Sequence, residues 1–109
     1  MLTEIRNLRV PMPRSANMNG SRGGRYKVRQ SPEPLVKQRY CTTVRFYDRF
    51  SHADGTPCSK NVDNLAKILL DALGKAYGLD DRWLDWRLVL EKVDVSVEEP
   101  YCLVTVERI

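Results

Sequence analysis

The sequence predicts an α+β fold in which a small mixed sheet of about four strands carries one main helix on a face. Four segments alternate apolar and polar residues as strands do, and one segment has apolar residues at helical spacing. These segments follow one another in the order strand, strand, helix, strand, strand. Because the chain has 109 residues, 42% of them hydrophobic, we expect a single domain over residues 1–109.

The first expected strand covers residues 2–10 and ends at Pro11 and Pro13. From about residue 15 to residue 34 the chain is rich in Ser, Asn, Gly, Arg and Pro and shows no apolar period. A long stretch of this kind in a small domain is typically functional or mobile. We interpret it as a flexible basic arm that binds phosphates, and the alternative is a surface loop that is basic by chance. Its basic residues are Arg22, Arg25, Lys27 and Arg29.

The second expected strand lies within residues 37–50. Tyr40, Val44 and Phe46 fall on one side of it and are expected in the core. The other side combines cations with an aromatic ring and suits contact with a sugar-phosphate backbone, although a solvated charged face is the alternative. That side carries Arg39, Thr43, Arg45, Tyr47 and Arg49.

The most regular segment runs from Asp63 to Tyr77 and predicts a helix. Asp63 suits the N-cap position, and Gly78 suits the position just after the last turn. The apolar stripe expected to face the sheet consists of Leu65, Ile68, Leu69, Ala72, Leu73 and Ala76.

The remainder of the chain predicts two strands. One begins at Leu84 and alternates to Glu91, and the other runs from Tyr101 to Ile109 after a turn at 98–100. We interpret Trp83 and Trp86 as residues of the core or of a dimer interface rather than platforms for base stacking.

Composition excludes several classes of function. No apolar run approaches the roughly 20 residues of a membrane span, and the first residues lack the pattern of a secretory signal, so we expect a cytoplasmic protein without membrane contact. The three cysteines are odd in number and widely spaced, which disfavours both a disulfide framework and a zinc site. His52 is the single histidine and lies in a turn-like stretch, which disfavours Ser/His or Cys/His catalysis.

The net charge of +4 conceals an asymmetry between the two halves of the chain. Residues 1–49 carry 11 Lys/Arg and 3 Asp/Glu, whereas residues 50–109 carry 7 Lys/Arg and 11 Asp/Glu. A basic half joined to an acidic half suits a protein that binds a polyanion and acts on it with carboxylates, and an ordinary solvated surface is the alternative.

Oxygen-bearing side chains cluster at both ends of the predicted helix. Asn61 and Asp63 are two residues apart at its start, Lys67 follows one turn later, and Asp80 and Asp81 come directly after its end. Oxygen ligands of this kind suit Mg²⁺ or Mn²⁺, and Lys67 would stabilise charge that develops on a phosphate. The alternative is a helix cap, a surface ion pair and an acidic turn.

The same residues resemble the motif of the RusA-type Holliday-junction resolvases. The matching segments are Asn61-Val-Asp63-Asn64-Leu65-Ala-Lys67, Asp71-Ala-Leu73 and Asp80-Asp81, and Pro13-Arg-Ser-Ala-Asn17 is similar to a segment near the family's N-terminus. The resemblance implies a Mg²⁺-dependent homodimeric endonuclease that nicks four-way, branched DNA symmetrically. It also implies that Asp63 and Asp81 are catalytic metal ligands and that Lys67 is the motif lysine.

One position departs from the family motif, because Asn61 stands where the first motif aspartate is expected. An amide oxygen still ligates Mg²⁺, but the site loses a negative charge, so we expect weaker metal binding and slow or absent cleavage. The alternative function is therefore a catalytically weak protein that binds branched DNA. Whether Asp54 or Asp80 compensates is left open by the sequence.

Helix length adds a geometric expectation. At about 1.5 Å per residue the predicted helix is about 21 Å long, with Asp63 at one end and Asp81 beyond the other. Ligands of one Mg²⁺ ion lie only about 2.0–2.1 Å from it. We therefore hypothesise that Asp63 of one protomer meets Asp81 of its partner across a two-fold axis.

Overall fold

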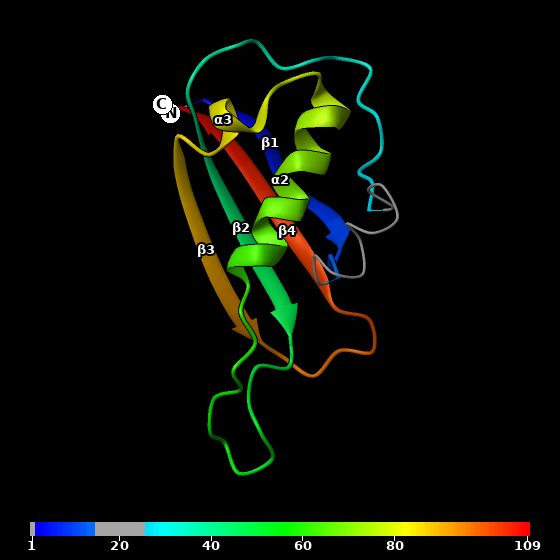
Figure 1. Cartoon of the computed structure of the whole chain (residues 1–109), viewed down its shortest axis with the longest axis vertical. Helices are drawn as coiled ribbons and strands as arrows, with labels where there is room; N and C mark the ends of the chain where they lie inside the picture. The colour runs from blue at the N-terminus through cyan, green and yellow to red at the C-terminus, as the bar shows by residue number, and fades with distance from the viewer. Residues whose placement is uncertain (1, 15–25) are drawn as a thin grey trace.

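The computed structural model describes residues 2–14 and 26–109, and its elements form one sheet with helices on one face (Figure 1). This arrangement confirms the predicted α+β class. Within the described residues no helix is long and apolar enough to span a membrane. The elements are β1 (Thr3–Pro11), β2 (Tyr40–Asp48), α2 (Asp63–Tyr77), α3 (Asp81–Leu84), β3 (Arg87–Asp94) and β4 (Tyr101–Arg108).

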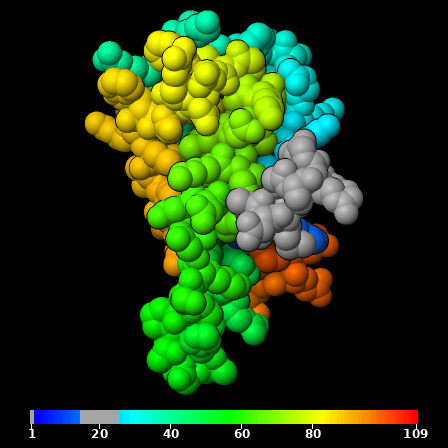
Figure 2. All heavy atoms as spheres, viewed as in Figure 1, coloured from blue at the N-terminus to red at the C-terminus, as the bar shows by residue number. Residues whose placement is uncertain are grey.

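The sheet has the strand order β1-β4-β2-β3. Strand β4 pairs antiparallel with both β1 and β2, whereas β2 and β3 are parallel. A parallel pair requires a crossover connection, and here the connection contains both helices. The loop that leads from β2 to α2, residues 49–62, extends past the lower end of the sheet and stands out in the space-filling view (Figures 1 and 2).

The core lies between the sheet and α2. Tyr40, Val44 and Phe46 are fully buried on β2, as predicted, and β4 contributes three further buried side chains between them and β1. The helix meets this surface with Leu69 and Leu73, which are both fully buried. The buried residues of α2 are Ala66, Leu69, Leu70, Ala72, Leu73, Gly74 and Ala76, so the predicted stripe is correct except that Leu65 and Ile68 are only half-buried.

The start of α2 differs from the prediction. Val62, not Asp63, is the N-cap residue, and Asp63 is the first helical residue. The side-chain oxygen of Asn61 accepts a hydrogen bond from the backbone N–H of Asp63 at 2.9 Å. The end agrees with the prediction, since Gly78 adopts a left-handed conformation with φ of 67° that favours glycine.

The segment after α2 also differs from the prediction of a strand that begins at Leu84. Residues 81–84 form the short helix α3, and β3 begins only at Arg87. Asp80 caps α3 by accepting a hydrogen bond from the backbone N–H of Arg82 at 3.1 Å, which starts a helix where alternation alone suggested a strand. Leu84 is fully buried, and its carbonyl accepts a hydrogen bond from the Thr42 hydroxyl at 2.6 Å, which joins α3 to β2.

Gly74 permits the segment after α2 to pack directly against the helix. A Cβ atom at this position would lie 2.3 Å from the carbonyl oxygen of Leu79, far inside van der Waals contact. The obstructing atom belongs to the backbone, so it cannot rotate away as a side chain does.

We therefore expect Gly74→Ala to lower the free energy of unfolding by about 1–3 kcal/mol, even though alanine is the better helix former by about 1 kcal/mol. Urea denaturation measures the difference. The exposed neighbour Lys75→Ala serves as the control and should change stability by less than about 0.5 kcal/mol. A Gly74→Ala variant at least as stable as the wild type would contradict the close packing of this segment.

Candidate metal and phosphate site

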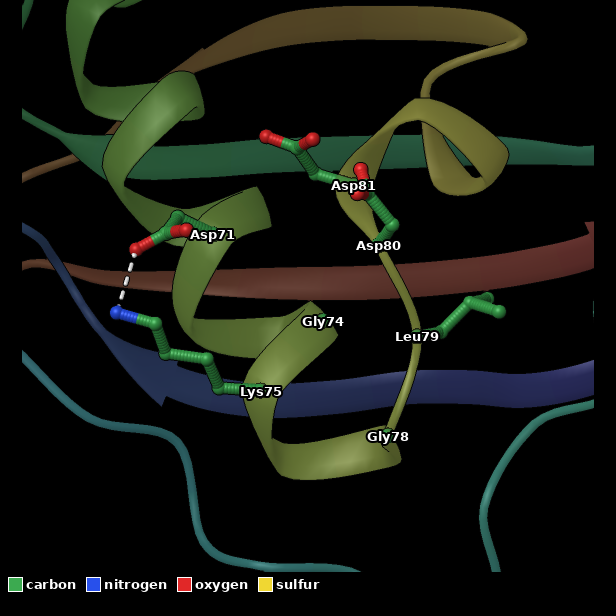
Figure 3. A pocket seen from close by; sticks show the side chains of 7 residues that line it. All are labelled: Asp71, Gly74, Lys75, Gly78, Leu79, Asp80 and Asp81. Carbon is green, nitrogen blue, oxygen red and sulfur yellow. Dashed lines mark ion pairs between the residues drawn. The ribbon is translucent and has the colours of Figure 1, made fainter.

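An acidic pocket of about 430 Å³ lies where the segment after α2 returns along the helix (Figure 3). Three carboxylates border it, one from α2 and two from the returning segment. Figure 3 shows the Asp81 side chain extending toward the turn of α2 that carries Asp71. The lining residues are Asp71, Gly74, Lys75, Gly78, Leu79, Asp80 and Asp81.

Local sequence explains why the chain returns along the helix. The left-handed conformation of Gly78 reverses the backbone, and the N–H of Leu79 donates to the carbonyl of Gly74 at 2.8 Å. The Leu79 side chain is buried and belongs to the core cluster, so it holds the reversed segment against the sheet. Asp80 and Asp81 therefore lie alongside the last turns of α2, with the backbone nitrogen of Asp81 beside Gly74, rather than beyond the end of the helix.

The carboxylates of the pocket repel one another. Burial raises the pKa of Asp81, and a hydrogen bond to Asp80 together with the negative charges of Asp80, Asp85 and Asp71 raises it further. The pKa of Asp80 is lowered, chiefly because its carboxylate accepts a hydrogen bond from the backbone N–H of Arg82. The two neighbouring carboxyl groups therefore hold their protons with different affinity, and a cation in the pocket would relieve the repulsion between their negative charges.

Within residues 2–14 and 26–109, Asp71 is the carboxylate of the pocket that forms an ion pair. Its Oδ2 lies 3.1 Å from Nζ of Lys75, one turn along α2, and this ion pair is drawn in Figure 3. Both side chains are largely exposed, so the pair contributes only about 0.3–0.5 kcal/mol and would yield readily to a competing ligand.

The predicted residues at the other end of α2 do not reach this pocket. Asp63 precedes Asp71 by two turns, which is about 12 Å along the axis. Both Asp63 and Lys67 are exposed, and among the described residues Lys67 forms no ion pair. Asp63 is thus absent from the pocket that contains Asp81, but the prediction that Asp81 lies beyond the end of the helix is wrong, because the chain returns along α2 as far as Gly74.

One protomer does not present a complete cage for a divalent ion. Within residues 2–14 and 26–109 no three side chains of His, Cys, Asp or Glu are close enough together to hold a metal. The amide oxygen of Asn61 already accepts the N–H of Asp63. Asp54 lies in the projecting loop of residues 49–62, where its carboxylate accepts hydrogen bonds from Thr56 that lower its pKa.

The predicted basic residues are distributed over both faces of the sheet. Arg22 and Arg25 lie outside the described residues. Lys27 and Tyr26 border a second pocket of about 320 Å³ beside α2, which also contains Asp71 and Lys75, and Arg29 follows as an exposed residue in the same segment.

The cations predicted on β2 are already engaged. Arg45 lies on the face of the sheet away from α2 and pairs with Glu91 at 3.2 Å. The guanidinium of Arg39 covers the ring of Trp86 at 4.2 Å, and Arg49 donates to the hydroxyl of Ser96 at 3.0 Å. Of the described cations in the predicted set, Lys27 is the one that borders a pocket with a site carboxylate.

The sequence reasoning did not identify Asp71 and Asp85 as partners of Asp81. Asp71 lies ten residues before Asp81, and no helical or strand period joins the two positions. The available signal was Gly78, because a left-handed C-terminal glycine reverses the chain and returns whatever follows toward the last turns of the helix.

No protein-family model, no curated protein and no solved structure matches the chain.

The raised pKa of Asp81 predicts a pH-dependent effect of Asp81→Asn. A raised carboxyl pKa means that the folded chain holds this proton more tightly than the unfolded chain does. From the ordinary value of 3.8 upward, the wild type should therefore lose stability relative to the variant as the pH rises. Because Asp81 is mostly exposed, we expect a change of only a few tenths of a kcal/mol, about 1–3 °C in melting temperature between pH 3.5 and pH 7.

Thermal unfolding of both proteins across this pH range measures the effect, with Asp63→Asn as a control that changes a carboxylate outside the pocket. A difference between wild type and Asp81→Asn that stays constant with pH would show that the pocket does not strain this carboxylate.

Proposed function

We propose that this protein is a cation-dependent endonuclease of the RusA type that cleaves four-way, branched DNA by hydrolysing phosphodiester bonds. The observation that carries the proposal is the return of Asp80 and Asp81 along α2, which surrounds one pocket with three carboxylates and raises the pKa of Asp81. Strained carboxylates in a pocket are typical of functional sites. The motif that resembles the family contains these same two aspartates.

The cation in this proposal, Mg²⁺ or Mn²⁺, needs ligands from two protomers. One protomer offers Asp80 and Asp81 as neighbours, and Asp63 of the partner would complete the set, as the resemblance to a homodimeric family suggests. A divalent ion polarises phosphate oxygens and lowers the pKa of bound water when it is present. The chain itself would bind and orient the phosphate and place a positive charge, Lys67, near it.

The helix side of the molecule suits contact with a DNA backbone. Lys27 and Lys75 border one pocket beside α2, and Lys75 also borders the acidic pocket. Phosphates bound by these cations would lie next to Asp80 and Asp81. The open face of the sheet suits this role less, because Arg45 there is already paired with Glu91.

A second candidate function is binding of branched DNA without cleavage. It is favoured by the hydrogen bond that engages the amide oxygen of Asn61, which stands at the position of the first motif aspartate. An amide that is neutral and already bonded holds a hard cation less strongly than a free carboxylate does.

Nicking of a synthetic four-way junction in the presence of Mg²⁺ or Mn²⁺ tests the proposal. Asp63→Asn and Asp81→Asn should each lower the rate by about a hundredfold or more, because each removes a charge that holds the cation. Asn61→Asp should raise the rate. Glu98→Gln, which makes the same kind of change at an exposed residue between β3 and β4 that does not line the pocket, is the matched control.

Two results of this assay would contradict either the role of Asn61 or the proposed cleavage activity. Efficient cleavage by the wild type that Asn61→Asp leaves unchanged would refute the role given to Asn61. Binding of the junction without cleavage, by the wild type and by Asn61→Asp alike, would favour the second candidate.

The salt dependence of binding tests which face meets the DNA. Each phosphate contact adds a slope of about 0.9 log units of affinity per log unit of salt. The double variant Lys27→Gln/Arg29→Gln should reduce the slope by about 1–2 units in a gel-shift titration with a four-way junction. Arg9→Gln removes a cation that covers the Tyr101 ring on the opposite face and should leave the slope unchanged. The reverse pattern would assign DNA binding to the open face of the sheet.

A further inference from the structure

Strand β3 forms an unprotected edge of the sheet. Among the described residues it pairs with β2 alone, through eight consecutive register positions without a bulge, so the backbone groups along its outer side have no strand partner (Figure 1). Leu88 and Val89 in its middle are 37% and 43% exposed. A long, regular edge with exposed apolar residues at its middle is a template for pairing with another strand.

The sequence of β3 complements itself around Val89. When a second copy of the strand runs antiparallel with the two Val89 residues opposite each other, Leu88 lies opposite Leu90 and Arg87 lies opposite Glu91. Each of these pairs occurs twice because of the symmetry. Apolar residues thus meet apolar residues and opposite charges meet, which are the cross-strand pairs that stabilise sheets.

The alternation of faces agrees with this register. Leu88 and Leu90 pair in register with Thr42 and Val44, which are buried on the helix side of the sheet. Val89 is in register with Thr43 and therefore lies on the open face. Residues opposite each other across the two-fold axis would therefore share a face, as an antiparallel pair requires.

We propose that β3 pairs with β3 of a second copy of this chain about a two-fold axis at Val89, which joins two four-stranded sheets into one of eight strands. Two neighbouring symmetric registers are less favourable. Centring on Glu91 places two carboxylates opposite each other, and centring on Leu90 places Leu88 opposite Lys92 and Val89 opposite Glu91. Charge complementarity therefore favours a second copy of this chain as the partner of β3, in the register centred on Val89.

The local charges accommodate the partner. Glu91 is paired with Arg45 at 3.2 Å, and both side chains are about half exposed, so one carboxylate oxygen of Glu91 is available to Arg87 of the second copy. A carboxylate shared between two guanidinium groups on the open face would then link β2 of one protomer to β3 of the other.

The proposed pairing has a consequence for the arrangement of the helices. A two-fold axis perpendicular to the sheet keeps both α2 helices on the same face and reverses their direction. The end of one protomer that carries α3 then lies beside the opposite end of its partner. The β3 pairing goes beyond the proposed function, because it does not depend on whether the protein cleaves DNA.

Charge substitutions at Val89 test the proposal, because this residue would face its own copy. The wild type should sediment at twice the 12.6 kDa mass of the chain. Val89→Lys alone and Val89→Glu alone should each weaken self-association by about tenfold or more, since like charges would lie opposite each other. An equimolar mixture of the two variants should restore the dimer as a mixed species, which native mass spectrometry resolves.

The control is Val36→Lys, which makes the same change at a residue that is 61% exposed and outside the sheet, and it should remain dimeric. Circular dichroism of the single variants confirms that they fold. A monomeric wild type, or a dimer that both single variants retain, would overturn the proposal. A monomeric wild type would also remove the shared cation site of the proposed function, whereas a dimer that both single variants retain would overturn the β3 pairing alone.

Discussion

The reversal of the backbone at the end of α2 is the constraint on which the rest of the site depends. It requires Gly78 in a left-handed conformation and Gly74 without a side chain where the carbonyl of Leu79 meets the helix. Without this close approach, Asp80 and Asp81 would continue beyond the helix end and would not share a pocket with Asp71. Gly74 and Gly78 thus allow Asp71 to share a pocket with Asp80 and Asp81, where burial and the negative charges of the other two carboxylates raise the pKa of Asp81.

The two faces of the sheet carry different functional groups. The side covered by α2 holds the core and the acidic pocket, together with Lys27 and Lys75. The open side holds the stacked rings of Tyr47 and Tyr101, whose centroids are 4.7 Å apart, and the guanidinium of Arg9 over Tyr101. Because Arg9 contacts the Tyr101 ring and Arg45 pairs with Glu91, these two cations of the open face are less available to bind phosphates than the composition of that face suggests.

The role of Asn61 shows how local structure and function compete for one side chain. Its amide oxygen accepts the N–H of Asp63 and so satisfies a donor that the first turn of a helix leaves without a partner. A carboxylate would accept the same bond, so the local fold does not require the amide. Asparagine keeps this hydrogen bond but lacks the negative charge of an aspartate, so the proposed cation site would lose one charge at this position.

Local sequence patterns predicted the class of fold, the residues of α2 apart from its N-cap, and the core side of β2, because hydrophobic periodicity and glycine at a helix end act over a few residues. Residue count alone placed Asp81 beyond the end of α2, whereas the reversal at Gly78 brings it back beside Gly74. Tertiary structure alone decided that residues 81–84 form a helix, that Asp71 joins Asp81, and that β3 lies at an edge beside β2. These features depend on contacts between segments distant along the chain, namely the Thr42 bond to Leu84, the approach of Leu79 to Gly74 and the strand order, and no local pattern encodes such contacts.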